Sequence, residues 1–233
     1  WRIMGGCGAS LKGKVAASYT WETDATRQAT MRRILTRDEL VRRLARTPPL
    51  EDLLTADDLE KQRVAASAAE LTPAAVLLLV VNHPGEPTVV FTQRTAHLAD
   101  HAGQISFPGG RMEEGDEGPA HTALREAREE VGIDPGLVEI LGELPDYHTS
   151  TGFRVRPVVG WAEPPLAYEP DPFEVADVFE VPLGFLLEPA NHRYESAFYK
   201  GRLRHYWAMP WEGRFIWGAT AGMLVTFQRI VGR

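Results

Sequence analysis

Three glutamates close together in the sequence have a spacing that suits metal-ion chemistry. Glu126, Glu129 and Glu130 stand at positions i, i+3 and i+4, so a helix brings their carboxylates onto one face. Like charges this close repel each other, and a cation among them relieves the repulsion. Carboxylate oxygens favour a hard divalent metal ion. The alternative is an ordinary solvated face, because many helices carry several charges on one side.

The helix that must position these glutamates is predicted over residues 119–131. Pro119 suits the first helical position and Gly132 suits the residue just past the end. At about 100° per residue, a separate face of the helix is apolar. This stripe consists of Ala120, Ala123, Leu124, Ala127 and Val131.

Short apolar or alternating segments around this helix predict a sheet. Strands are expected at residues 74–82, 88–92, 104–107, 138–144, 153–161, 174–181, 194–199 and 203–209. Further helices are expected at residues 37–46, 55–69, 182–187 and 217–231. Turn residues predict two hairpins, one from the first two strands and one from the last two. Several strands around one central helix, with another helix at the end, favour an α/β sandwich with a mixed sheet.

The chain is expected to divide near Thr72-Pro73. Residues 1–71 would then form an N-terminal arm with short helices, and residues 72–233 the main domain. Residues 1–30 show no clear period, so the sequence does not predict how ordered they are.

Composition narrows the class of protein. The net charge of −7 argues against general nucleic-acid binding. Polyanionic small molecules are still compatible with it, provided that a metal ion and local arginines supply positive charge. The single cysteine, Cys7, fits a reducing compartment, so we expect a cytoplasmic protein. No apolar run approaches the length of a membrane span, so we expect no membrane association.

The segment from Gly110 to Ile133 resembles the Nudix box. In that pattern a Gly is followed by five residues, a Glu, seven residues, Arg-Glu, an aliphatic residue, any residue, Glu-Glu, any residue, Gly and an aliphatic residue. Here Asp116 stands at the first Glu, eight residues separate it from Arg125, and Ala127 is a small aliphatic residue. The resemblance implies an α/β/α sandwich with a central catalytic helix. It also implies hydrolysis of a nucleotide diphosphate compound with Mg²⁺ or Mn²⁺.

Segments outside the box resemble the coenzyme A pyrophosphatase branch of that family. Residues 91–96 (FTQRTA) and 101–110 (HAGQISFPGG) are similar to its upstream signature, and the likeness covers about residues 72–231. Departures are Phe91 in place of Leu, Thr95 in place of Ser and Ala99 in place of Arg. The resemblance implies cleavage of coenzyme A, or of an acyl-coenzyme A, to 3′,5′-ADP and 4′-phosphopantetheine or its acyl form.

The family resemblance also assigns roles to the box residues. It implies that Glu126, Glu129 and Glu130 bind the metal, helped by the main-chain carbonyl of Gly110. Arg125 is expected to pair with a nearby glutamate and orient it, rather than to touch substrate.

Other acidic residues are candidates for the general base or for simpler roles. Glu174 lies where many relatives carry an acidic residue near the metal, and its alternative is a strand-edge charge. Glu129 is the competing general base. Asp116 is expected to be a cap or loop residue rather than a metal ligand.

Substrate contacts are expected mainly from the upstream signature. Arg94, His101 and Gln104 match it, and Arg94 is a candidate phosphate ligand, although a histidine in a tight loop is often structural. Arg111 is a further candidate for an extra phosphate, as are Arg154 and Arg156. For these three arginines the alternative is a surface position.

Other functions remain open at this point. Another substrate, such as ADP-ribose or an oxidised nucleoside triphosphate, is the enzymatic alternative. A Nudix-fold ligand sensor without turnover is the second, although a pure binder needs neither all three glutamates nor Arg125. We also consider a homodimer in which the late tryptophans and the final helix form the interface, because aromatic residues are enriched at such surfaces.

Overall fold

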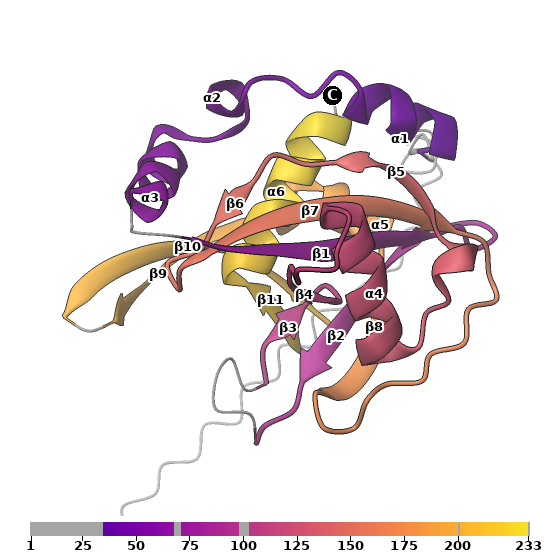
Figure 1. Cartoon of the computed structure of the whole chain (residues 1–233). Helices are drawn as coiled ribbons and strands as arrows, with labels where there is room; N and C mark the ends of the chain where they lie inside the picture. The colour runs from indigo at the N-terminus through magenta and orange to yellow at the C-terminus, as the bar shows by residue number, and fades with distance from the viewer. Residues whose placement is uncertain (1–34, 68–70, 98–102, 200, 233) are drawn as a thin grey trace, which may run out of the picture. The chain divides into compact units, whose positions relative to one another are not determined.

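The computed structural model describes residues 35–67, 71–97, 103–199 and 201–232 (Figure 1). By chain contacts, Arg33–Arg233 form one compact unit. Within the described ranges, no helix is long and apolar enough to cross a membrane.

An eight-stranded sheet lies in the middle of this unit (Figure 1). Its strands follow the order β3-β2-β1-β7-β5, and in addition β4 pairs with β1, β6 with β7 and β8 with β2. The strands are β1 (Thr72–Val81), β2 (Thr88–Arg94), β3 (Ile105–Ser106), β4 (Gly109–Arg111), β5 (Glu139–Glu143), β6 (Tyr147–His148), β7 (Phe153–Ala162) and β8 (Val175–Pro182).

The pairing of β1 makes the sheet mixed. β1 runs parallel to β7 along its whole length, from Thr72 opposite Phe153 to Val81 opposite Ala162. It runs antiparallel to β2 and to β4. The predicted mixed sheet and the first predicted hairpin are therefore confirmed.

Helices and a smaller sheet complete the unit. The helices are α1 (Arg37–Leu44), α2 (Leu50–Leu53), α3 (Ala56–Ala66), α4 (Pro119–Val131), α5 (Leu183–Leu187) and α6 (Gly218–Val231), with 3-10 turns η2 (Pro135–Leu137) and η3 (Pro189–Asn191). The smaller sheet has the order β11-β10-β9 and contains β9 (Arg193–Tyr199), β10 (Arg202–Trp211) and β11 (Arg214–Trp217). The antiparallel pair β9–β10 confirms the second predicted hairpin.

Helix α4 covers one face of the large sheet and has the predicted bounds. Its buried alanines, Ala123 and Ala127, belong to the same hydrophobic cluster as Ala75 and Leu77 of β1. The helix ends at Gly132, whose φ of 74° is left-handed. A Cβ at Gly132 would lie 2.8 Å from the Cβ of Glu169, so both backbone conformation and space require glycine there.

Helix α6 covers the other face of the sheet (Figure 1). It is buried from Thr220 to Phe227 and again at Ile230 and Val231. The suggestion that the final helix forms a dimer surface is therefore wrong, because its side chains fill the core. Among the late tryptophans, the ring of Trp211 packs 4.5 Å from that of Phe185, whereas Trp217 is 39% exposed.

The N-terminal helices of the described part contribute to the same core. Leu40, Leu44 and Leu53 are buried in the cluster that also holds α6. Arg43 donates a hydrogen bond to the main-chain oxygen of Val231, and Arg229 donates one to that of Leu53. The boundary between an arm (residues 1–71) and the main domain stays a prediction, and residues 1–34 lie outside the described part.

An aromatic stack links three segments on the α6 side of the sheet. The ring of Phe91 lies between those of Phe107 and Phe179, at centroid distances of 5.1 and 5.7 Å. The guanidinium carbon of Arg214, on β11, lies 3.8 Å from the centroid of Phe179. Stacked rings of this kind bury a large apolar area and add attraction between the rings.

Removing the middle ring should strongly destabilise the protein. Because Phe91 is fully buried, Phe91→Ala should lower the free energy of unfolding by about 3–5 kcal/mol. Phe198→Ala is the matched control, because Phe198 is 79% exposed, and it should change the free energy by less than about 0.5 kcal/mol. Urea denaturation followed by circular dichroism measures both. Equal effects from the two substitutions would contradict the assignment of Phe91 to the core.

Candidate active site

Strand β4 brings a glycine backbone against the glutamate face of α4. β4 pairs with β1 so that Gly110 lies opposite Ala75 and Gly109 opposite Val76. A Cβ added to Gly110 would lie 2.5 Å from the carboxylate carbon of Glu126. Only glycine leaves room for this contact, so the backbone at Gly110 and the carboxylate of Glu126 line one small space.

Gly109 makes the second contact between β4 and the helix. Its N–H donates a 3.1 Å hydrogen bond to Oε2 of Glu130. Its φ is +153°, and an added Cβ would lie 2.4 Å from the main-chain oxygen of Ala75. The two glycines therefore differ, because Gly109 is crowded by backbone and Gly110 by the end of a side chain.

The glutamates of α4 differ in exposure and in proton affinity. The side chains of Glu130, Glu126 and Glu129 are 8%, 16% and 59% exposed. Burial raises the pKa of Glu130 to about 7, and the nearby negative charge of Glu126 adds to this, while the Gly109 N–H and Arg94 oppose it. Burial also raises the pKa of Glu126, against the lowering effect of Arg125. Two carboxylates thus lack full compensation of their charge.

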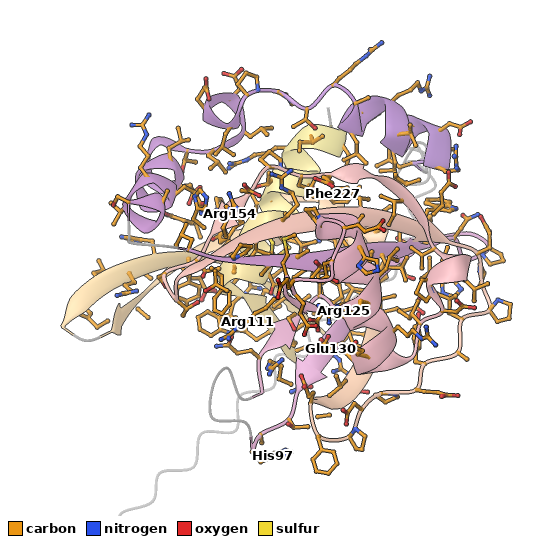
Figure 2. All side chains as sticks on the ribbon, viewed as in Figure 1. His97, Arg111, Arg125, Glu130, Arg154 and Phe227 are labelled. Atoms are coloured by element: carbon orange, nitrogen blue, oxygen red, sulfur yellow. The ribbon has the colours of Figure 1, made fainter. Side chains whose placement is uncertain are left out.

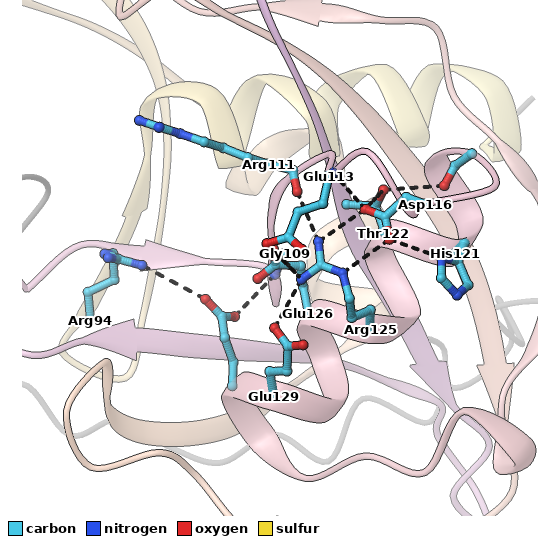
Figure 3. Close-up of polar contacts among 12 residues, drawn as sticks. Arg94, Gly109, Arg111, Glu113, Asp116, His121, Thr122, Arg125, Glu126 and Glu129 are labelled. Carbon is cyan, nitrogen blue, oxygen red and sulfur yellow. Dashed lines mark hydrogen bonds and ion pairs between the residues drawn. The ribbon is translucent and has the colours of Figure 1, made fainter.

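Arg125 is the cation at the centre of this cluster (Figure 3). Its Nη1 lies 3.0 Å from Oε1 of Glu126 and 3.0 Å from Oε2 of Glu129. Its Nη2 donates to the main-chain oxygen of Arg111. The predicted contact between Arg125 and a nearby glutamate is present, and the guanidinium also ties β4 to α4.

Asp116 anchors Arg125 from the other side. Nε and Nη2 of Arg125 each donate a 3.1 Å hydrogen bond to one oxygen of Asp116, which is a bidentate pair. Asp116 also accepts from Thr122 Oγ1 at 2.8 Å and lies 2.9 Å from His121 Nδ1. The hydrogen bond from Arg125, above all, holds the pKa of Asp116 far below its usual range.

Asp116 lies in the loop between β4 and α4, as expected. The sequence did not predict its contact with Arg125, nor that its side chain is only 2% exposed. Its place at the first acidic position of the box indicates that it belongs to the site, but not which residue it contacts.

Arg94 approaches the cluster from β2, and Glu174 approaches it from the turn just before β8. Nη1 of Arg94 lies 3.9 Å from Oε1 of Glu130 and 4.0 Å from Oε2 of Glu174. Nε of Arg94 is buried and has no hydrogen-bond partner among the described residues. Arg94 and Glu174, which were predicted from outside the box, therefore lie near Glu130 in the structure.

Other predicted substrate residues lie apart from the carboxylates or outside the described ranges. The main-chain oxygen of Gln104 accepts a hydrogen bond from the N–H of Arg94. The side chain of Arg111 points away from the cluster, and its guanidinium carbon lies 5.4 Å from the ring centroid of Phe153 (Figures 2 and 3). His101 lies outside the described residues. Roles for these three residues in substrate binding stay predictions.

The two remaining arginine candidates are on β7. Arg156 is occupied by Glu143 and Asp146, at 2.8 and 2.6 Å. Arg154 is exposed. These observations agree with a surface position for both arginines.

The chemistry of this cluster fits a divalent metal ion. In the described part of the chain, no group of three or more His, Cys, Asp or Glu side chains is arranged to hold a metal ion as it stands. At this cluster Nη1 of Arg125 lies 3.0 Å from a carboxylate oxygen of Glu126 and of Glu129. The surrounding donors are carboxylate and main-chain carbonyl oxygens, which Mg²⁺ and Mn²⁺ prefer. The raised pKa values of Glu126 and Glu130 indicate negative charge that such an ion would compensate.

Comparisons with known proteins extend these observations. Residues 71–196 match the family model described as NUDIX domain. The Escherichia coli K12 protein named uncharacterized Nudix hydrolase NudL is 38% identical over 179 residues, covering 77% of this chain and 93% of that protein.

Two solved structures also match. The NUDIX domain of Shewanella oneidensis NrtR, complexed with ADP ribose, is 26% identical, with a TM-score of 0.40, and the match covers 57% of this chain and 86% of that one. A MutT/nudix family protein from Enterococcus faecalis is 14% identical, with a TM-score of 0.42, and the match covers 77% and 71% of the two chains. At these TM-scores neither structure informs the ligand of this chain.

The two glycines of β4 should respond differently to substitution. Gly110→Ala pushes against the movable end of Glu126, so the fold should survive while Mn²⁺ affinity falls about tenfold or more. Gly109→Ala meets backbone atoms, so it should lower the free energy of unfolding by about 2 kcal/mol. Calorimetric titration with Mn²⁺ and urea denaturation separate the two effects. A Gly110→Ala protein with unchanged Mn²⁺ affinity would argue against a metal site at this glycine.

The buried Glu130 should make stability depend on pH when divalent ions are removed by EDTA. A carboxyl whose folded pKa is raised to about 7 stabilises the fold fully below its unfolded pKa and loses that contribution as pH rises through 7. Glu130→Gln cannot ionise. Its stability relative to the wild type should therefore increase by about 3 kcal/mol between pH 4 and pH 8. Glu129→Gln, at a side chain that is 59% exposed, is the control, and urea denaturation is the measurement. A constant difference between Glu130→Gln and the wild type would refute the assigned pKa.

Proposed function

This chain belongs to the Nudix hydrolase family, and on that basis we propose that its substrate is coenzyme A or an acyl-coenzyme A. As a member of this family it is a pyrophosphohydrolase that acts on a nucleoside diphosphate derivative. The proposed products are 3′,5′-ADP and 4′-phosphopantetheine or its acyl form.

The observation that carries the proposal is where the coenzyme A signature lies. Residues 91–94 of this signature form much of β2, and residues 105–110 supply β3 and β4. Arg94 comes from the first segment and approaches Glu130 and Glu174. The second segment leads directly into the glycines at the start of the Nudix box, which lie against Glu130 and Glu126. The segments similar to the coenzyme A branch therefore adjoin the candidate reaction centre, which supports a role in choosing substrate.

Hydrolysis of a diphosphate adds water across the P–O–P bridge. The water oxygen bonds to one phosphorus, the bridging bond breaks, and the second phosphate leaves as a monoester. The proton lost by the water goes to a base. Negative charge grows on the bridging oxygen, so the reaction needs cationic groups at the diphosphate and a carboxylate near the water.

We assign the metal site to the carboxylates of Glu126, Glu129 and Glu130 and to the main-chain carbonyl of Gly110. Bound Mg²⁺ or Mn²⁺ would stabilise charge on the phosphate oxygens and lower the pKa of a water molecule. Arg125, held by Asp116, orients Glu126 and Glu129 and does not reach for substrate. The side chain of Arg94 is 28% exposed, and its Nη1 lies 3.9 Å from Glu130 and 4.0 Å from Glu174, so we assign its guanidinium to a phosphate oxygen.

Between the two candidate bases, the contacts favour Glu174. Oε2 of Glu129 accepts a 3.0 Å hydrogen bond from Nη1 of Arg125, which competes for the lone pair that a proton would need. Glu174 is 51% exposed and lies 4.0 Å from Nη1 of Arg94. Glu174 is thus the carboxylate with more freedom to accept a proton from water.

A substrate panel tests this proposal. Coenzyme A, ADP-ribose and 8-oxo-dGTP are each incubated with the protein and Mg²⁺, and products are separated by liquid chromatography. Coenzyme A should yield 3′,5′-ADP and 4′-phosphopantetheine. Glu130→Gln should lower kcat at least about 100-fold while the circular dichroism spectrum stays unchanged. Glu212→Gln, an exposed glutamate between β10 and β11, is the control and should keep full activity.

Each other outcome has a clear meaning. Product from ADP-ribose or from 8-oxo-dGTP alone would overturn the choice of substrate. A lack of product from every compound would favour a ligand sensor. Full activity of Glu130→Gln would remove the assigned metal site.

A further inference from the structure

A large aromatic side chain stands in solvent directly beside the candidate base. Phe173 precedes Glu174 in the connection between β7 and β8, and it is 75% exposed. Single exposed hydrophobic residues are common on protein surfaces. Its fixed backbone and its position next to the reaction centre distinguish Phe173 from the other exposed residues.

Hydrogen bonds hold the backbone of Phe173 from two sides. Its own N–H donates to Oδ1 of Asp171 at 2.9 Å, and the N–H of Asp171 donates to the main-chain oxygen of Glu130 at 2.9 Å. On the other side, Oγ1 of Thr95 donates to the main-chain oxygen of Phe173 at 2.8 Å. The N–H of Thr95 donates to the main-chain oxygen of Glu174 at 2.9 Å. The turn is therefore tied both to α4 and to the end of β2.

These ties place the backbone of Phe173 at the edge of the candidate active site. Adjacent Cα atoms are about 3.8 Å apart, so Phe173 begins one residue away from Glu174, and Thr95 directly follows Arg94. His97, labelled in Figure 2, marks the same end of β2. Because the turn is fixed, the Cα that carries the exposed ring stays next to the residues assigned to the diphosphate.

The chemistry of the Phe173 ring suits a planar partner better than a flexible chain. The side chain is 75% exposed, and its phenyl ring offers one flat apolar face on a fixed backbone. A nucleobase stacks on such a face with little loss of freedom, whereas a flexible chain loses more freedom when it is ordered against a single ring.

We propose that Phe173 stacks on the adenine base of the substrate and so contributes to its recognition. This inference rests on the proposed function, because it takes the diphosphate to lie on the cluster formed by Arg94, Glu130 and Glu174. The base then lies at the outer edge of the site, against Phe173, while the bond to be cleaved lies at the glutamates.

Two matched ligands isolate the contact with the base. AMP and ribose 5-phosphate differ only in the adenine. The wild type should bind AMP more tightly than ribose 5-phosphate in calorimetric titrations. Phe173→Ala should weaken the binding of AMP about tenfold and leave the affinity for ribose 5-phosphate unchanged. In turnover of coenzyme A, the same variant should raise KM about tenfold and leave kcat within about twofold, because stacking is equal in ground and transition states.

Three further variants distinguish ring stacking from a general apolar contact. Phe173→Trp should keep the AMP affinity of the wild type because it retains a stacking surface. Phe173→Leu keeps an apolar side chain without a ring and should bind AMP as weakly as Phe173→Ala does. Phe198→Ala removes an equally exposed phenylalanine from β9 and should change nothing.

Several results would overturn the inference. These are equal binding of AMP and ribose 5-phosphate by the wild type, equal weakening of both by Phe173→Ala, and full AMP affinity in Phe173→Leu. The last result would mean that the contact with AMP needs only an apolar side chain and not a ring. Failure of the proposed function looks different, because a protein that leaves coenzyme A intact can still show the selective loss of AMP binding.

Discussion

Crowding of carboxylates that cannot all face water is the constraint on which the site depends. Glu130 is almost fully buried and Glu126 is mostly so, and burial of like charges favours protonation unless a cation is near. Two arginines approach this face from different directions, Arg125 from the helix itself and Arg94 from β2. The N–H of Gly109 adds a third positive end. Helix α4 and strands β2 and β4 therefore each supply a group that offsets part of the negative charge of these glutamates.

Main-chain hydrogen bonds hold the connection between β7 and β8 against the last turn of α4. The N–H groups of Glu169 and Asp171 donate to the main-chain oxygens of Val131 and Glu130, at 2.8 and 2.9 Å. The last turn of α4 therefore shares backbone hydrogen bonds with the segment that carries Glu174. Because these bonds need no particular side chain, the distance between helix and loop depends on the backbone. The side chain of Asp171 adds a further hydrogen bond within the loop, because its Oδ1 accepts from the N–H of Phe173.

Strong local signals made much of this fold predictable. The bounds of α4 follow from Pro119, Gly132 and the apolar stripe, and the structure has the same bounds. The elements that were missed are α2, β4, β6, β11 and the 3-10 turns η2 and η3, none longer than four residues. A segment of two to four residues shows no period, and the glycines of β4 read as a turn. Its pairing with β1 is a long-range contact that composition does not reveal.

The candidate site was predictable in its residue types and less so in its connections. The glutamates and Arg125 came from one helix and a known pattern, so their proximity followed from spacing. The approach of Arg94 to Glu130 joins residues from β2 and α4, and only the folded sheet brings them together. The contact of Asp116 with Arg125 was likewise not predictable from the sequence. This bidentate contact depends on the path of a loop rather than on helical spacing. An aspartate is one methylene shorter than the glutamate of the box, and the segment between it and Arg125 is one residue longer. In this chain the longer segment follows a path that still brings the shorter side chain into a bidentate contact with the guanidinium. The reach of this acidic group is therefore set by the loop and the side chain together, and an engineered change in either one alone acts directly on the anchoring of the central arginine.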